Sequence, residues 1–102
     1  MNKSEIKSRR ISWEIIKKSI SKNKRLSEVT LDYFKKENSS LSNDDKKFIT
    51  MLVQGTVRLS GRLDLEIKDV FKGDYADLRD NLKILLRLGV YQIHYMDSVP
   101  DY

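Results

Sequence analysis

The stretch LLRLGVYQIHYMDSVPDY, residues 85–102, places a dense apolar segment directly before a proline turn. The apolar residues extend upstream at helical spacing and cover most of a helix circumference, which indicates a central helix. We expect this helix to begin at Asp74 or Tyr75 and to end before Pro100, which cannot continue it. Its main stripe consists of Leu78, Leu82, Leu85, Leu86, Gly89 and Ile93, and Leu88, Val90, Tyr91 and Tyr95 widen it.

Two short helices open the chain, because apolar residues recur at helical spacing in two separate stripes. The first stripe consists of Ile6, Trp13, Ile16 and Ile20. The second consists of Leu26, Val29 and Tyr33, with Thr30 and Phe34 beside them. The polar cluster Asn38-Ser39-Ser40 that follows is typical of a loop.

A third helix is predicted to start at Ser42-Asn43-Asp44-Asp45, which has the form of a capping box. Its apolar residues are Phe48, Ile49, Leu52 and Val53. Glycine weakens a helix, so Gly55 and Gly61 are candidate sites for a kink or a break, and we expect the break near Ser60-Gly61. A fourth helix would then carry Leu59, Leu63, Ile67, Val70 and Phe71.

The predicted fold class is all-α, with about five helices. No Asn-Gly or Asp-Gly hairpin dipeptide occurs, and no alternating apolar run is bounded by turns on both sides. With 102 residues, 39% of them hydrophobic and 34% charged, the chain suits one globular domain, residues 1–102, with a modest core.

Several kinds of chemistry are excluded or disfavoured by the sequence. It has no cysteine and one histidine, His94, so disulfides, thiolate zinc sites and histidine clusters cannot form. Neither nucleotide-binding glycine motif is present, and the Asp pairs 44/45, 64/69 and 77/80 suit helix caps and dipole partners. We therefore expect no catalytic residue, cofactor or metal. The charged start MNKSEIKSRR and the lack of a long apolar run favour a cytoplasmic protein without a membrane segment.

The positive charge is concentrated in residues 1–25, which hold nine lysines and arginines against two glutamates, a net charge of +7. Residues 41–102 have a net charge of −1. A basic segment suits phosphates, and arginine binds them with a planar fork, although a lysine-rich face can also be simply solvated. Trp13 and Tyr33 could stack on bases, but their place on apolar stripes favours core packing. The candidate RNA-binding residues are Lys3, Lys7, Arg9, Arg10, Lys17, Lys18, Arg58 and Arg62.

Two segments, SNDDKKFITMLVQGTVR and LRLGVYQIHYMDSVPDY, resemble the NusB-like RNA-binding domain at the N-terminus of Sun/Fmu-type ribosomal RNA cytosine-C5 methyltransferases. The resemblance covers residues 42–102. The pieces that carry it are Asp45-Lys46 with Phe48, Leu52-Val53-x-Gly55-x-x-Arg58, Leu63-Asp64, Leu86-Arg87-Leu88-Gly89-x-Tyr91-Gln92, Asp97, Val99 and Pro100. These residues are interpreted as family markers, with Gly89 letting a neighbouring helix approach, and not as a site.

The resemblance implies an all-α NusB-like helical bundle that binds structured ribosomal RNA as part of an S-adenosylmethionine-dependent methyltransferase. The alternative is a NusB-type transcription antitermination factor, which binds RNA and a small ribosomal protein. A third alternative, an enzyme with its own activity, is disfavoured because the chain has no donor-binding loop and no cysteine nucleophile. In the family the chain continues past Tyr102, so we expect a fragment whose exposed last helix either pairs with a second copy as a homodimer or is covered by the helices already present.

Overall fold

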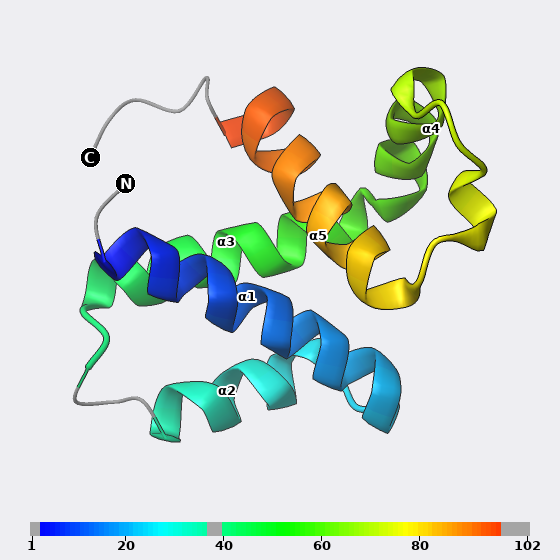
Figure 1. The fold of residues 1–102 in the computed structure, drawn as a ribbon. Helices are drawn as coiled ribbons and strands as arrows, with labels where there is room; N and C mark the ends of the chain where they lie inside the picture. Colours follow the sequence, from blue (N-terminus) through cyan, green and yellow to red (C-terminus); the bar gives the residue numbers. More distant parts are fainter. Residues whose placement is uncertain (1–2, 37–39, 97–102) are drawn as a thin grey trace. The chain divides into compact units, whose positions relative to one another are not determined.

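The computed structural model describes residues 3–36 and 40–96, and over these residues it is all-α, as predicted. Asn38-Ser39 and the proline turn with Asp97, Val99 and Pro100 lie outside the described residues. The chain forms two compact units, Met1–Gln54 and Gly55–Tyr102. In chain order the elements are α1 (Lys3–Lys22), α2 (Leu26–Lys36), α3 (Asn43–Arg58), α4 (Ser60–Val70), the 3₁₀ turn η1 (Tyr75–Asp77), α5 (Asp80–Tyr91) and the π-helical turn η2 (Gln92–Met96) (Figure 1).

In the first unit, α1 packs against α2 (Figure 1). The predicted apolar stripe of α1 is confirmed at Ile16, which is buried, and is wrong at Ile6 and Ile20, which are 54% and 57% exposed. Serine residues occupy part of the buried face instead. Ser12 is fully buried and donates its hydroxyl hydrogen to the Ser8 carbonyl at 2.8 Å, so its polar group is satisfied inside the helix. A small, satisfied serine lets another helix come close. The buried face of α1 consists of Ser8, Ile11, Ser12, Ile15 and Ile16.

The connection from α1 to α2 turns at Asn23, which has a positive φ of 51° that asparagine tolerates better than most residues. The predicted stripe of α2 is confirmed, with Val29 buried and Leu26 and Tyr33 half-buried. The predicted capping box of α3 also forms. The Asp45 amide donates to Ser42 Oγ at 3.0 Å, and the Ser42 amide donates to Asp45 Oδ2 at 3.2 Å.

The break between the third and fourth helices occurs at Leu59, next to the predicted Ser60-Gly61. Gly55 does not interrupt α3. Gly55 is buried against the phenol ring of Tyr91 on α5, which is itself buried. A Cβ at position 55 would overlap this ring. Glycine is therefore needed here for close approach rather than for flexibility. The prediction that Gly89 lets a neighbouring helix approach is wrong, since a Cβ at this position would meet no described atom within 4 Å.

The last helix begins at Asp80, five or six residues later than predicted. Asp74 instead caps η1, with its Oδ1 accepting a hydrogen bond from the Ala76 amide at 3.0 Å. In the second unit α4 packs against α5, and the buried side chains are Leu63, Ile67, Tyr75, Ile84, Leu88 and Tyr91.

The predicted main stripe of the last helix is not its buried face. Leu82, Leu85 and Ile93 are 43%, 49% and 62% exposed, whereas Ile84, Leu88 and Tyr91 are buried. A helix that is apolar around most of its circumference offers more than one candidate face, and packing selects among them. That the exposed residues pair with a second copy stays a prediction.

Candidate nucleic-acid interface

Most of the candidate cations lie on one face of α1. At 3.6 residues per turn, Lys3, Lys7, Arg10, Lys17 and Lys18 fall within an arc of about 100°. We call these five residues the basic face. Three of them are exposed and two, Lys7 and Lys18, are half-buried. Lys7 Nζ donates to Ser40 Oγ at 2.8 Å, so this end of the face also contacts the start of the segment leading to α3.

Arg9 does not belong to the basic face. Adjacent residues on a helix point about 100° apart, so Arg9 and Arg10 diverge and cannot grip one phosphate as a pair. The Arg9 guanidinium carbon lies 5.5 Å from the centre of the Phe48 ring on α3, and Nη1 lies 3.8 Å from Glu5 Oε2. The Arg9 side chain is 33% exposed, against 57% for Arg10. Arg9 is thus engaged within the first unit, and Arg10 faces solvent.

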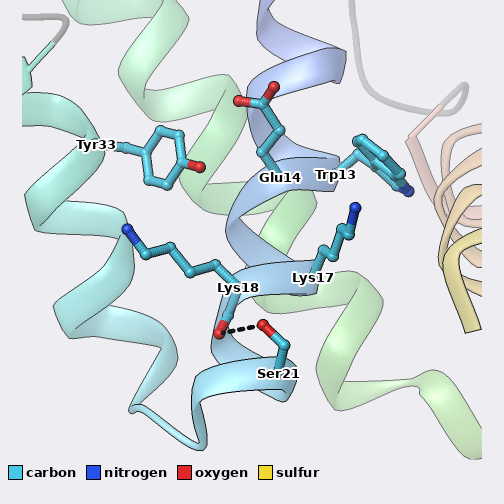
Figure 2. A pocket seen from close by; sticks show the side chains of 6 residues that line it. All are labelled: Trp13, Glu14, Lys17, Lys18, Ser21 and Tyr33. Carbon is cyan, nitrogen blue, oxygen red and sulfur yellow. Dashed lines mark hydrogen bonds between the residues drawn. The ribbon is translucent and has the colours of Figure 1, made fainter.

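A pocket of about 320 Å³ opens between α1 and α2 at the C-terminal end of the basic face (Figure 2). Lys17 Nζ lies 4.8 Å from the centre of the Trp13 ring, and Lys18 Nζ lies 5.7 Å from the centre of the Tyr33 ring. The two aromatic residues are half-buried, so the prediction that they pack in the core is confirmed only in part. The lining residues are Trp13, Glu14, Lys17, Lys18, Ser21 and Tyr33.

The polar groups of the pocket have complementary roles. Burial, and next the negative charge of Glu14, raise the pKa of Tyr33, which the positive charge of Arg10 partly offsets. The Tyr33 hydroxyl is therefore neutral at pH 7 and can donate a hydrogen bond. Glu14 Oε1 lies 3.7 Å from Arg10 Nη1, and its carboxylate can only accept. The pocket thus combines two aromatic rings, two ammonium groups, the hydroxyl groups of Ser21 and Tyr33, and one carboxylate.

Arg58 and Arg62 belong to the second unit rather than to α1. Arg58 is exposed in the last turn of α3. Arg62 on α4 is 71% exposed, and its Nε lies 3.5 Å from Glu66 Oε1. Exposed pairs of this kind hold an arginine weakly, so both side chains are accessible to an anion.

Sequence reasoning missed a bidentate ion pair in the second unit. Arg87 donates to Asp64 through Nε at 2.7 Å and Nη2 at 3.0 Å, and the Tyr75 hydroxyl donates to Asp64 Oδ1 at 2.6 Å. Burial alone would raise the pKa of Asp64, but the hydrogen bonds from Arg87 and Tyr75 lower it below 3.8. Burial and the bond to Asp64 raise the pKa of Tyr75 to about 12. The prediction that Asp64 serves as a helix-dipole partner is therefore wrong. Asp64 is the centre of a structural network.

His94 makes a side-chain contact within the second unit. Its Nδ1 lies 2.8 Å from Glu66 Oε2, and the Tyr95 hydroxyl donates to Glu66 Oε1 at 2.8 Å. These two hydrogen bonds lower the pKa of Glu66. Within residues 3–36 and 40–96, no group of three potential metal ligands occurs. No helix in this part of the chain is long and apolar enough to cross a membrane.

Comparison with known proteins bears on these observations. Residues 7–102 match the NusB family. A "Probable ribosomal RNA small subunit methyltransferase B" from Synechocystis sp. strain PCC 6803 is 37% identical over 60 residues, which is 59% of this chain and 14% of that protein. No solved structure matches the chain significantly. The family match covers nearly the whole chain and agrees with the all-α fold, so this chain belongs to the NusB family.

Proposed function

We propose that this chain is an RNA-binding module that docks structured ribosomal RNA for a cytosine-C5 methyltransferase. The observation that supports this most directly is the basic face of α1, where five cations share one side of a helix and Glu14 is the acidic residue among them. The name of the similar protein from Synechocystis supplies the class of RNA and the reaction that the module would serve.

The dimensions of the basic face suit a nucleic-acid strand. Lys3 and Lys18 are separated by fifteen residues, which correspond to about 22 Å along a helix axis. This length can follow several phosphates of one strand, because successive phosphates rise about 3.4 Å along a helical duplex. The contacts would be electrostatic and largely independent of sequence, which suits a docking surface.

The chain itself is proposed to bind without catalysing a reaction. The ion pair of Arg87 and Asp64 joins two side chains of the second unit, and the pocket between α1 and α2 contains no histidine or cysteine. Methyl transfer would then take place in another domain or partner that receives the docked RNA. We propose that the whole assembly is cytoplasmic and that its catalytic part, rather than this chain, uses S-adenosylmethionine as the methyl donor.

Salt dependence tests the proposal. A fluorescently labelled ribosomal RNA hairpin should bind the 102-residue chain with an affinity that falls roughly 100-fold between 50 and 200 mM salt, as expected for about four phosphate contacts. Fluorescence anisotropy measures this directly. An affinity that does not change with salt would contradict the proposal. Binding to a transcript RNA only together with a small ribosomal protein would favour the antitermination alternative.

A charge-reversal pair locates the interface. Arg10→Glu with Lys17→Glu changes two residues of the basic face and should weaken RNA binding about 10- to 100-fold, since each lost contact is also replaced by repulsion. The matched control is Lys47→Glu with Lys72→Glu, which changes the net charge equally at two exposed positions outside the face. Circular dichroism checks that both variants stay helical. Equal losses in the two variants would mean that only net charge matters.

A further inference from the structure

We infer that the pocket between α1 and α2 receives one unstacked nucleobase that carries an exocyclic amino group, with the base stacked on Trp13 and its phosphate at Lys17 and Lys18. This inference rests on the proposed function and specifies the part of the RNA that is recognised. Figure 2 shows Trp13, Lys17, Lys18 and Tyr33 around the same opening, with Glu14 between the two aromatic residues.

The indole ring of Trp13 can accept a stacked base because its contact with Lys17 can be exchanged. Lys17 Nζ lies 4.8 Å from the ring centre, and the Lys17 side chain is exposed. A cation at an exposed ring interacts more weakly than a stacked base does. A base can therefore replace the ammonium group on the ring, and the displaced ammonium group can bind the phosphate of the same nucleotide.

Glu14 gives the pocket a preference among bases. A carboxylate repels phosphates, so its presence on the basic face suits a neutral ligand group that donates hydrogen bonds. The exocyclic amino groups of cytosine, adenine and guanine are such donors, whereas uracil offers only its ring N3–H, which lies between two carbonyl oxygens that a carboxylate repels. The neutral Tyr33 hydroxyl, on the opposite wall of the pocket, can donate to a carbonyl or ring nitrogen. Glu14 is thus expected to favour amino-bearing bases over uracil.

The size of the pocket restricts the form of the RNA. About 320 Å³ is at the lower end of the range for small-molecule sites, which suits one base and not a base pair. In a duplex both faces of each base are covered by stacking, so only a loop, a bulge or a single strand can supply a free base. The module would therefore dock an unpaired nucleotide beside a phosphate backbone.

Intrinsic fluorescence provides the test, because Trp13 is the single tryptophan of the chain. The 102-residue chain is titrated at one ionic strength with 12-residue oligocytidine, with oligouridine and with a blunt 12-base-pair RNA duplex. Oligocytidine should quench Trp13 and bind at least 5-fold more tightly than oligouridine, and the duplex should leave the fluorescence unchanged. Saturated binding of oligocytidine without quenching, or equal affinities for the two single strands, would overturn the inference.

Variants separate the contributions of the pocket. Glu14→Gln should remove the preference for oligocytidine, because the amide now presents donors as well as an acceptor. Trp13→Ala should lower the affinity at least 10-fold by anisotropy of labelled oligocytidine, and Trp13→Phe, which keeps a ring and the fold, should lower it less. Unchanged affinity in both Trp13 variants would overturn the inference.

The outcomes also distinguish the inference from the proposed function on which it rests. Salt-dependent binding of the ribosomal RNA hairpin without any response of Trp13 would remove the pocket and leave the basic face as the interface. No binding of any RNA would remove both proposals.

Discussion

The first unit, residues 1–54, contains 13 lysines and arginines against 7 acidic residues, whereas the second unit, residues 55–102, contains 7 against 8. The two units also place their cations differently. In the first unit Arg9, Lys17 and Lys18 of α1 lie over aromatic rings, and Arg9 and Arg10 each lie beside a glutamate one turn away. In the second unit Arg87 makes a two-pronged ion pair with a half-buried aspartate.

This difference indicates what each unit can offer a ligand. The ion pair of Arg10 and Glu14 is partly exposed and contributes little free energy, so a phosphate can replace Glu14 as the partner of Arg10 with little loss of stability. The bidentate pair of Arg87 and Asp64 is half-buried and stronger, so Arg87 serves the fold. The same residue types thus support binding in one unit and stability in the other.

The largest expected effect comes from removing the centre of the structural network. Asp64→Ala leaves the Arg87 guanidinium and the Tyr75 hydroxyl without their acceptor. We expect the free energy of unfolding to fall by about 2 to 3 kcal/mol, less than for a fully buried pair because Asp64 is partly exposed. Urea denaturation measures this, and RNA affinity should not change at a temperature where the protein is folded.

The control for this variant is Asp69→Ala, which removes an exposed carboxylate from the same helix. Its effect should stay within about 0.5 kcal/mol. If the two variants lose equal stability, the network contributes nothing specific. If Asp64→Ala weakens RNA binding as strongly as the basic-face variant, the functional contrast between the units is wrong.

Two glycine substitutions test how closely the helices of the second unit pack. Gly55→Ala forces the buried ring of Tyr91 to move, and we expect a loss of about 1 to 2 kcal/mol. Gly61→Ala meets no described atom within 4 Å and replaces a helical glycine, so it should stabilise the protein by about 0.5 kcal/mol. Thermal denaturation of both variants checks the opposite signs. Two effects of the same sign would contradict the close contact between Gly55 and Tyr91.

Acid should weaken the structural network. The pKa of Asp64 is below 3.8 in the folded protein, so its contribution to stability is present above that value and is lost as the pH falls through the folded pKa. The difference in unfolding free energy between the wild type and Asp64→Asn should therefore shrink from pH 6 to pH values below 3.8. Urea denaturation at several pH values measures this difference, and other titrating groups cancel in it. A constant difference would show that Asp64 is not ionised in the pair.

The smallest effects are expected from the two adjacent arginines, which sharpen the comparison within α1. Arg9→Ala removes the contact with Phe48 and should cost about 0.5 to 1 kcal/mol of stability with little change in RNA affinity. Arg10→Ala should leave the melting temperature unchanged and reduce the salt slope of RNA binding by about one. Reversed results would place Arg9, and not Arg10, at the interface.

Local signals in the sequence were sufficient for much of the fold. The capping box at Ser42 and Asp45 is a short-range hydrogen-bond motif, so its four residues predict the start of α3 without reference to the rest of the chain. The all-α class and the break beside Ser60 likewise follow from periodicity and helix propensity. The basic segment 1–25 is a matter of composition alone.

The sequence by itself therefore determined the helical class, the start of α3, the break before α4, the basic segment and the family, because each depends on near neighbours or on residue types in order. Only the tertiary structure decided which faces are buried. Ser12 is buried although it is polar, and Leu85 is exposed although it is apolar. It also decided that Arg9 contacts Phe48 and that Trp13 and Tyr33 meet at a pocket. These features depend on residues far apart in the chain, whose packing no local pattern records.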